Sequence, residues 1–482
     1  MSRFLTSVIC AVLLSSFTSA APASTPVSSV VSSSVATPSV VSSAIAAPSS
    51  VASAVSPIIS VIGGSGASTA SAAAATPTVA YASDRANGMM WNPDTTADVQ
   101  PIRGSLGATI LGPQNIPIGQ QNPDLLAPPT TDAGTVGQAK WPMSLSANRL
   151  QTGGWARQQN SDVMPMATGM AGVNMRLEAG AVRELHWHKT AEWAYIISGY
   201  TQITSVNSDG QNFLATLGPG DLWYFPPGVP HSLQGTNQTA AGTEFLLVFP
   251  DGDFSEDSTF LLTDWTAHIP KEVLAKNFQT TMSSFDEIPG SELYIFPMDS
   301  PSDNATAVED PAGQVPQSYA YSFSQIAPTP LSGGSIKIAD STKFPIATQV
   351  AVAEVVVEPG AMRELHWHPT QDEWGYFLEG QGRMTLFASS GNARTYNYEA
   401  GDVSYIPATY GHYVENTGNT TLKFLEIWNT AVFQDISLSQ WLALTPPALV
   451  QAHLQLSNEI IAGLNKTKQF VVGPANSSQT SN

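Results

Sequence analysis

Histidine placement is the feature of this sequence most directly tied to chemistry. Six of the eight histidines in the 482-residue chain occupy matching positions in two similar segments. In chain order they are His186, His188, His231, His366, His368 and His412. Side chains two residues apart in a β-strand point to the same face, so each His-Trp-His run can turn both imidazoles inward and its tryptophan, Trp187 or Trp367, outward.

A carboxylate follows each His-Trp-His run and can reach the same point from the next strand: Glu192 in the first segment and Glu373 in the second. Three imidazoles and one carboxylate suit a divalent transition metal, and six-coordination leaves two positions open for a bidentate ligand. The competing interpretation is an inert core in which the histidines hydrogen-bond to one another, but duplication of the whole set favours a metal. Residue types alone do not choose the ion, because iron, nickel, cobalt and copper also accept these ligands.

The two segments belong to a long internal repeat. The sequence Gly-Ala-Val-Arg-Glu-Leu-His-Trp-His at 180–188 recurs at 360–368 with Met in place of Val. Likewise, Gly-Asp-Leu-Trp-Tyr-Phe-Pro at 220–226 corresponds to Gly-Asp-Val-Ser-Tyr-Ile-Pro at 401–407. Self-similarity of this length predicts two homologous domains, which we place at residues 146–310 and 311–464.

Short runs rich in aromatic and β-branched residues predict β-strands in each repeat, for example at 194–197, 201–206, 222–225 and 244–249. Turn signals that contain glycine or proline separate these runs. Strands at this spacing are typical of an antiparallel sandwich or barrel. The expected fold class is therefore all-β, with two barrels and short flanking helices near 271–277 and 447–456.

The amino-terminal region differs in composition from the repeats. Residues 1–20 combine Arg3, an apolar run and small residues near a cleavage point, as in a secretory signal peptide. Residues 21–80 hold no charged residue and consist almost entirely of Ser, Ala, Thr, Val and Pro, which predicts a disordered or O-glycosylated stalk. We expect an N-terminal arm at 81–145 and a polar tail at 465–482.

These features predict a secreted or cell-wall-associated glycoprotein. Cys10, the only cysteine, lies in the predicted signal, so the mature chain would have no disulfide and would depend on burial for stability. Glycosylation acceptors of the form Asn-X-Ser/Thr occur at Asn237, Asn304, Asn419, Asn465 and Asn476. The 38 acidic and 19 basic residues give a net charge of -19, which excludes a strongly basic nucleic-acid binder. No run after the signal is long and apolar enough to predict a membrane span.

Both repeats resemble the cupin pattern of a Gly, five residues, His-X-His, three or four residues, Glu, six residues and Gly. The pattern reads Gly180, His186, His188, Glu192, Gly199 in the first repeat and Gly360, His366, His368, Glu373, Gly380 in the second. The second cupin motif supplies His231 and His412. This chain departs from that motif at Thr409, where the pattern has Gly, and at Gly235, where it has Asn. Both positions concern turn geometry and not ligation.

Within the cupins, the chain resembles the two-domain oxalate decarboxylases from about residue 81 to about residue 464. An arginine precedes the first His of each repeat (Arg183 and Arg363), Glu256 lies in a loop at 255–259, and Glu426 lies in the second repeat. The resemblance implies manganese at two sites per chain, and conversion of oxalate and a proton to formate and carbon dioxide. It also implies that dioxygen is required without being consumed overall. Such cupins often assemble as trimers or hexamers.

By resemblance, the first repeat holds the main catalytic site, with Glu256 on a mobile lid as general acid and base, and Arg183 bound to a substrate carboxylate. Position 183 is odd whereas the histidines are even, so a regular strand would turn Arg183 away. A bulge, or a strand that begins after Glu184, is therefore expected. The second site, near Arg363 and Glu426, is expected to be structural or weakly catalytic.

The lid sequence has two open interpretations. Residues 255–259 could instead begin a helix around 261–265, with Ser, Asp and Thr as caps. Lids of this family more often carry Asn where Asp257 stands. The additional carboxylate either raises the pKa of Glu256 by repulsion or is an exposed cap.

Two other functions fit the same fold. An oxalate oxidase, or another cupin dioxygenase that gives hydrogen peroxide and carbon dioxide, would use the same three histidines and glutamate. It would differ in whether a proton donor reaches the substrate carbon, so Glu256 discriminates between the two. A non-catalytic storage or wall protein is the third alternative, and two intact ligand sets disfavour it.

Overall fold

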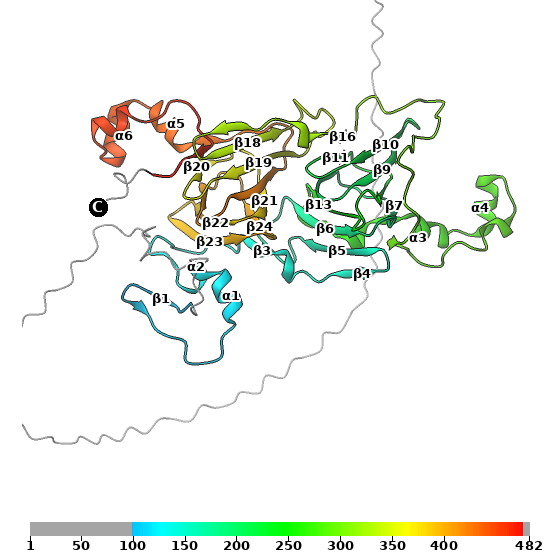
Figure 1. Cartoon of the computed structure of the whole chain (residues 1–482), viewed down its shortest axis with the longest axis horizontal. Coiled ribbons are helices and arrows are strands. Elements are labelled where there is room, and N and C mark those ends of the chain that lie inside the picture. Colours follow the sequence, from blue (N-terminus) through cyan, green and yellow to red (C-terminus); the bar gives the residue numbers. More distant parts are fainter. Residues whose placement is uncertain (1–98, 476–482) are drawn as a thin grey trace, which may run out of the picture. The chain divides into compact units, whose positions relative to one another are not determined.

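The computed structural model describes residues 99–475, which form two β-barrels, barrel 1 from the first repeat and barrel 2 from the second (Figure 1). The expected all-β fold class with short helices is confirmed. The predicted signal peptide, the stalk, residues 81–98 of the arm and residues 476–482 of the tail lie outside the described residues. None of the helices between residues 99 and 475 has the length and hydropathy that a bilayer crossing requires.

Barrel 1 consists of two antiparallel sheets. One has the order β10 (Asn212–Leu217), β9 (Thr201–Val206), β12 (His231–Gly235), β7 (Val182–Trp187) and β14 (Phe260–Leu261), with β15 (Ile295–Phe296) also paired to β7. The other has the order β16 (Ala320–Tyr321), β11 (Leu222–Phe225), β8 (Glu192–Ser198), β13 (Thr243–Phe249), β6 (Ala171–Leu177), β5 (Gly154–Gln159) and β4 (Arg149–Gln151). All four strand runs expected in the first repeat are present.

Barrel 2 repeats this arrangement. Its larger sheet has the order β17 (Thr329–Leu331), β18 (Gly334–Ala339), β19 (Ala351–Val357), β26 (Leu422–Trp428), β21 (Glu373–Glu379), β24 (Asp402–Ile406) and β3 (Lys140–Pro142). Its smaller sheet has the order β23 (Asn392–Glu399), β22 (Gln381–Ala388), β25 (His412–Asn416), β20 (Met362–Trp367) and β27 (Ile436–Ser437), with β28 (Val471–Val472) also paired to β20.

Short helices follow each barrel. After barrel 1 come α3 (Leu262–Ala267) and α4 (Lys271–Phe278), and after the last long strand of barrel 2 come α5 (Leu438–Ala443), α6 (Pro447–Leu454) and α7 (Asn458–Ala462). The helices expected near 271–277 and 447–456 are thus confirmed. The arm adds β1 (Ile102–Arg103), β2 (Leu106–Gly107), α1 (Ile116–Gln121) and α2 (Pro123–Leu126).

The two barrels exchange edge strands. β3 precedes barrel 1 in sequence, yet it pairs with β24 of barrel 2. β16 follows position 311, yet it pairs with β11 of barrel 1. A shared apolar core lies between the barrels and includes Trp193 and Leu246 from barrel 1 and Trp374 and Tyr405 from barrel 2. The expected boundary between the domains lies at residues 310 and 311. The larger sheet of barrel 2 therefore includes a strand that precedes this boundary, and the larger sheet of barrel 1 includes a strand that follows it.

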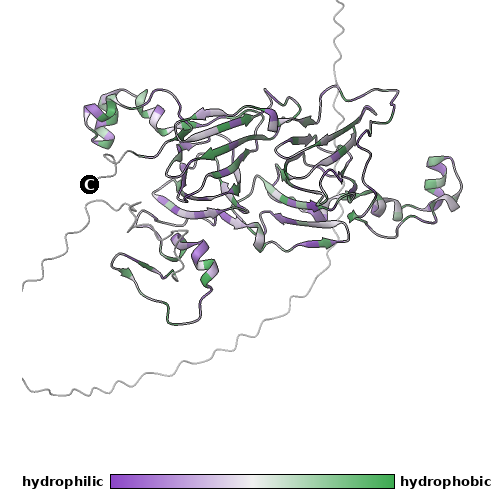
Figure 2. Cartoon of the chain, in the orientation of Figure 1, coloured by the Kyte–Doolittle hydropathy of each residue, from purple (hydrophilic) through white to green (hydrophobic). Residues whose placement is uncertain are grey.

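Apolar side chains concentrate on the strands that line these cores, as the green segments of the barrels show (Figure 2). Trp223 and Phe245 lie in the interior of barrel 1, and Tyr398 and Phe424 in that of barrel 2. Truncation of a buried aromatic side chain typically costs about 3–5 kcal/mol. The chain's only cysteine lies outside the described residues, so burial stabilises this part of the chain without disulfides.

A polar cluster crosses the interface between the barrels. Tyr195 of β8 donates a hydrogen bond to Glu354 of β19 at 2.8 Å. Glu354 also binds Lys337 at 2.9 Å and Lys423 at 3.2 Å. Burial alone would raise the pKa of Glu354, but the two lysines outweigh it and lower that pKa. The carboxylate is therefore charged in the folded protein at neutral pH.

We expect Glu354→Gln to lower the free energy of unfolding by about 3 kcal/mol at pH 7, because it leaves Lys337 buried beside a neutral group. A depressed carboxyl pKa stabilises the fold above the unfolded value near 4.5, and this contribution is lost as pH falls through the folded value. The difference between parent and variant should therefore shrink below pH 4.5, as measured by denaturant unfolding across pH. A difference that did not change with pH would contradict the ionic role of Glu354.

Candidate metal centres

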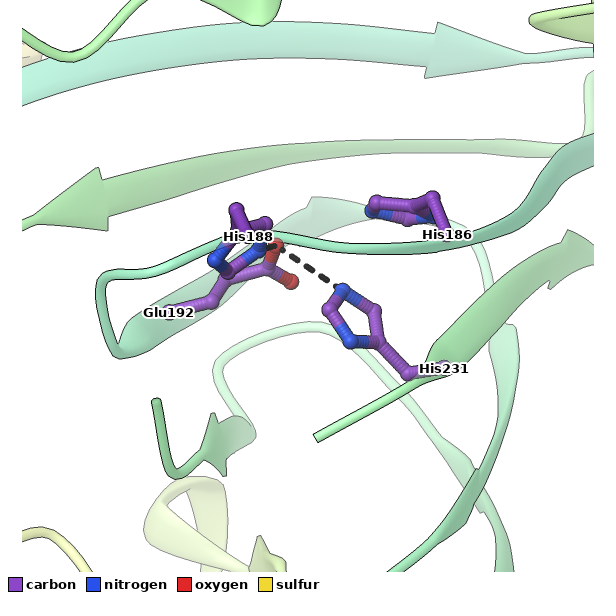
Figure 3. Close-up of side chains that lie close together, drawn as sticks. All are labelled: His186, His188, Glu192 and His231. Atoms are coloured by element: carbon purple, nitrogen blue, oxygen red, sulfur yellow. Dashed lines mark hydrogen bonds and ion pairs between the residues drawn. The ribbon is translucent and has the colours of Figure 1, made fainter. Parts of the chain in front are cut away.

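The four residues of the first predicted ligand set lie close together in barrel 1 (Figure 3). His186 lies in β7 and His188 directly follows that strand, while Glu192 begins β8 and His231 begins β12. One donor atom from each of the four buried residues lies within 4.8 Å of the others. Strand pairing explains this proximity, because His231 and His186 are direct partners in the β12–β7 ladder.

Backbone carbonyl groups orient the three imidazoles. The Nδ1 atoms of His186, His188 and His231 hydrogen-bond to the carbonyls of Glu184, Thr190 and Val229 at 2.6, 2.8 and 2.8 Å. Each neutral ring then donates through Nδ1 and keeps the lone pair of Nε2 for a metal. The Nε2 atoms of His188 and His231 lie 3.2 and 3.3 Å from the same oxygen of Glu192, which places nitrogen and oxygen donors around one point.

Barrel 2 holds a second set of the same kind: His366, His368, Glu373 and His412, again with donor atoms within 4.8 Å. Nδ1 of His366 and Nδ1 of His412 bond to backbone carbonyls at 2.7 and 3.0 Å. Nε2 of His366 is buried without a hydrogen-bond partner among residues 99–475, and Nε2 of His412 lies 3.4 Å from the Glu373 carboxylate. A buried acceptor normally has a partner, so the unpaired nitrogen of His366 fits a bound cation.

Local electrostatics favour the metal-binding protonation states of His186, His366 and Glu373. His412 is the exception, because the effect of burial is outweighed by the Glu373 carboxylate, which raises the pKa of this imidazole. Burial and the nearby Arg183 charge lower the pKa of His186 well below its ordinary value, and burial with Arg363 does the same to the pKa of His366. Burial alone would raise the pKa of Glu373, but His412 and His368 hold it below its ordinary value. Neutral imidazoles and an ionised carboxylate are the forms that bind a divalent metal.

Arg183 reaches the site through a bulge in β7. In the β12–β7 ladder, His231 pairs with His186 but Leu233 pairs with Arg183, so β7 contains an additional residue. The expected bulge is confirmed, and Arg183 is buried with 1% exposure. Glu184 is buried as well, but it binds the backbone N–H groups of Thr263 and Tyr294. It therefore anchors the segments that follow the lid.

The lid residue Glu256 binds the same arginine. Arg183 donates through Nη2 to Glu256 at 2.8 Å, and the Tyr294 hydroxyl donates to the same oxygen at 2.9 Å. The backbone N–H of Glu256 donates to the Gln158 side chain at 2.9 Å. The base of the lid also approaches the ligands, because the Phe254 ring lies 5.8 Å from the His188 ring. Tyr294 and Gln158 were not predicted, because nothing in their local sequence marks them.

Arg183 retains unused donors. Its Nε and Nη1 atoms are buried and have no hydrogen-bond partner within the described part of the chain. Buried, unpaired N–H groups of a guanidinium suit an incoming anion such as a carboxylate. A cavity of about 630 Å³ lies beside this cluster and is lined in part by Glu256, Asp257 and Tyr294. Glu256 therefore lies at the wall of this cavity and binds Arg183, which is not part of the cavity lining.

The lid does not begin a helix, so that alternative interpretation is wrong. Residues Glu256–Ser258 form a single 3₁₀ turn, and Ser255 Oγ accepts the N–H of Asp257 at 3.2 Å. β14 follows before α3 begins at Leu262. The turn therefore caps itself, and Glu256 is free to point to Arg183.

The second arginine has a different environment. Arg363 binds Glu426 at 3.0 Å and Asp435 at 2.8 Å, and Asp435 also binds Lys468. Although burial disfavours its charge, the two carboxylates raise the pKa of Arg363. Only its Nη1 lacks a partner among the described residues. Arg363 is thus committed to two buried acids, whereas Arg183 binds one.

The contact between Arg363 and Asp435 was not predicted from the sequence. The ladders identify its place, because Phe260 pairs with Trp187 and Ile436 pairs with Trp367. Asp435 therefore corresponds to Thr259, three residues after the position of Glu256. Alignment of the two repeats on these outward tryptophans would have found it.

The two departures from the cupin pattern leave the ligands in place. Gly228 has a φ of 76°, and Thr409 adopts nearly the same left-handed conformation with a φ of 70°. Their N–H groups donate to the carbonyls of His188 and His368 at 2.9 and 2.8 Å. A left-handed conformation costs a non-glycine residue about 1–2 kcal/mol, which barrel 2 tolerates at Thr409.

Comparison with known proteins agrees with this geometry. A family model described as Cupin matches residues 146–284 and 326–462. The chain is 52% identical over 374 residues to the oxalate decarboxylase OxdC of Bacillus subtilis, an alignment that covers 77% of this chain and 96% of OxdC. A probable oxalate decarboxylase of Arthroderma benhamiae is 42% identical over 381 residues and is covered over 93% of its length.

The chain belongs to the oxalate decarboxylase family of cupins. A solved structure of the Bacillus subtilis oxalate decarboxylase at pH 4.6 matches with a TM-score of 0.76 and 51% identity, and covers 79% of this chain and 100% of that one. Another solved structure, from a study of the Mn(II) centres of the same enzyme, also matches with a TM-score of 0.76 and 50% identity over 79% of this chain and 100% of that one. Together with the two ligand sets, membership of this family supports two manganese sites per chain.

Removal of manganese should destabilise this oxalate decarboxylase family member. A ligand at 100 times its Kd stabilises a protein by about 2.7 kcal/mol per site. We expect the chelated protein to unfold at a lower temperature and to recover its Tm with added Mn²⁺. Mg²⁺ should not restore it, because that ion prefers oxygen ligands. The variant His231→Gln should retain about one ion per chain in metal analysis. Identical thermal stability with and without manganese would contradict the assignment.

Proposed function

We infer that this chain is a manganese-dependent oxalate decarboxylase, which converts oxalate and a proton to formate and carbon dioxide. Family membership supports the reaction, and the observation that carries it is the placement of Glu256. This acid is hydrogen-bonded to Arg183 and Tyr294, at the wall of a cavity and on a loop whose base packs near a ligand histidine. Dioxygen is proposed as a required component that is not consumed overall.

The metal ligands we propose are His186, His188, Glu192 and His231 in barrel 1, and His366, His368, Glu373 and His412 in barrel 2. The chemistry that manganese supplies is a reversible one-electron oxidation, without which neither carbon of oxalate readily accepts the electrons of the breaking bond. Arg183 then binds one carboxylate of the substrate through an unpaired N–H group, at Nε or at Nη1. The guanidinium offers a fixed fork, so it orients oxalate as well as attracting it.

Glu256 manages the proton. It first takes the proton of the bound oxalate, and after carbon dioxide leaves it returns a proton to the remaining carbon, which becomes formate. The contacts from Arg183 and Tyr294 hold the carboxylate before the substrate arrives. With the lid closed, only 9% of its side chain is exposed, so water is largely excluded from the path of the proton.

We assign the second site a structural or weakly catalytic role. Arg363 is held by Glu426 and Asp435, both with side chains at most 1% exposed, so it has fewer donors for a substrate. Burial raises the pKa of Glu426, although Arg363 opposes this effect. A buried, committed arginine stabilises its surroundings more readily than it binds an incoming anion.

The runner-up function is oxalate oxidase, which gives hydrogen peroxide and carbon dioxide with the same ligands. The position of Glu256 favours decarboxylation, because an oxidase needs no acid that returns a proton to carbon. A non-catalytic wall protein is disfavoured by the unpaired nitrogens of His366 and Arg183 within the described residues, since a scaffold needs no buried polar atom without a partner.

Glu256→Ala should reduce formate production from oxalate by about 10²- to 10⁴-fold, the range that a general acid and base supplies. Manganese content should be unchanged, because Glu256 is not a ligand. Formate and hydrogen peroxide are assayed in parallel, with Glu272→Gln on α4 as a matched control that should keep full activity. Full formate production by Glu256→Ala would contradict the role of Glu256 as general acid and base. Hydrogen peroxide as the main product of the parent enzyme would favour the oxidase.

We further propose that the enzyme is secreted or cell-wall associated and glycosylated. The proposal rests on the signal-like segment at 1–20 and on the acceptor sites. Four acceptors fall in the described residues, and all four are exposed to solvent: Asn237, Asn304, Asn419 and Asn465. Exposure is a condition for glycan attachment.

We also propose a trimer or hexamer. Exposed apolar side chains gather on the helices and beside the outward tryptophans, including Trp265 at 57%, Phe278 at 61%, Trp441 at 53% and Leu444 at 65% exposure. The helices α4, α5 and α6 contain hydrophobic residues, drawn green in Figure 2. Contiguous exposed apolar surface is typical of interfaces between subunits.

Both proposals can be tested on protein collected from the culture medium of a eukaryotic host. We expect the chain in the medium, a mass that falls on enzymatic removal of N-glycans, and a sedimentation mass of three or six chains. Trp441→Glu should lower the assembly state. Retention of the chain inside the cells would overturn the first proposal, and a monomeric parent protein would overturn the second.

A further inference from the structure

The two adjacent acids of the lid each bind a different arginine. Glu256 accepts from Arg183 at 2.8 Å, and Asp257 pairs with Arg149 at 3.3 Å. Neighbouring residues in the 3₁₀ turn point in different directions, so one acid faces the interior and the other faces the surface. The lid is therefore held at two points, one of which carries the proposed catalytic carboxylate.

Tyr294 connects the two arginines. The guanidinium carbon of Arg149 lies 3.6 Å from the centre of the Tyr294 ring, and that of Arg183 lies 4.1 Å from it. Two cationic groups at these distances fit only on opposite faces of the ring. The hydroxyl of the same residue donates to Glu256 at 2.9 Å. Arg149 therefore contacts both the lid and the tyrosine that holds Glu256.

The inner and outer pairs differ in burial. The side chains of Arg183 and Glu256 are 1% and 9% exposed, whereas those of Arg149 and Asp257 are 28% and 80% exposed. Arg149 is fixed without the lid, because it lies in β4, pairs with β5 and binds Glu292. Asp257 has no such second anchor for its carboxylate within the described residues. Arg149 is thus the static partner and Asp257 the partner that moves with the lid.

We propose that Arg149 and Asp257 form a latch, a pair of positioning residues that sets how much of the time the lid holds Glu256 against Arg183 and Tyr294. This inference rests on the proposed function and adds a control of product outcome. Opening of the latch removes the proton donor from the carbon. The diverted reaction oxidises oxalate to two molecules of carbon dioxide and reduces dioxygen, with two protons, to hydrogen peroxide.

The size of the effect follows from exposure. An exposed ion pair contributes little, so loss of the latch should change the open population by about twofold to fivefold. The pair should also weaken with salt, because exposed charges are screened. The size of the effect distinguishes loss of the latch from loss of Glu256, which should lower the rate of formate production by at least about 10²-fold.

Hydrogen exchange measures the latch without reference to turnover. In the manganese-loaded full chain, Asp257→Asn and Arg149→Gln should each speed exchange of the amides at 256–259 by about twofold to fivefold. The double variant should exchange no faster than either single variant, because both remove the same contact. Asp286→Asn breaks the exposed Lys271–Asp286 pair, 2.6 Å apart and away from the lid, and should leave these amides unchanged.

The ratio of hydrogen peroxide to formate measures the effect of the latch on the reaction. Asp257→Asn should raise the ratio of peroxide to formate by about twofold to fivefold, and added inert salt should raise the ratio in the parent but not in the variant. Asp257→Glu, which keeps the charge that pairs with Arg149 and leaves the Arg149–Glu292 and Arg149–Tyr294 contacts in place, should keep the parent ratio. Additive effects of the single variants, or an equal effect of Asp286→Asn, would overturn the latch. A parent enzyme that makes neither product would instead overturn the proposed function, while the exchange experiment would still test the latch.

Discussion

The hydrogen bond between a backbone carbonyl and Nδ1 of each ligand histidine is the constraint on which both centres depend. In barrel 1 the carbonyls of Glu184, Thr190 and Val229 set the ring orientations. Because these acceptors belong to the main chain, the ligand geometry follows from the strands and turns themselves. The surrounding side chains can then change between the repeats while the ligand set stays the same.

That freedom appears in the two arginines. Arg183 and Arg363 occupy the same bulged position of equivalent strands, yet one binds a single lid acid and the other binds two buried acids. The difference arises from Glu426, which replaces Leu247, and from Asp435, which replaces Thr259. Two substitutions that touch no ligand histidine therefore change what the same guanidinium can bind.

The sequence predicts the ligand sets because period-two spacing and duplication are both visible in it. The spacing of His186 and His188 predicts that both side chains lie on the inward face of one strand. The same run recurs 180 residues later, which shows that the ligand set occurs twice. A bulge, or a strand that begins after Glu184, was expected because Arg183 stands at an odd position and the histidines at even ones, and the ladder shows the bulge between Arg183 and His186. Contacts between distant segments were not visible, because the interactions of Tyr294 and Gln158 with Glu256 depend on how loops fold back on the barrel.

The lid illustrates the same limit. Ser255, Asp257 and Thr259 fit a helix cap as well as a self-capped turn, and propensity does not distinguish them. The strand β14 decides the matter, because its pairing with β7 at His186 requires extended backbone directly after the turn. Tertiary pairing thus overrides a plausible local signal.

The exchange of edge strands limits how this architecture can be divided. β3 completes the larger sheet of barrel 2, and β16 completes that of barrel 1, so a cut between the repeats would leave each half with an unpaired sheet edge. Each isolated half would also expose its side of the shared apolar core. A fragment that contains only one repeat would therefore aggregate or associate with the complementary fragment. The two barrels fold as a single unit.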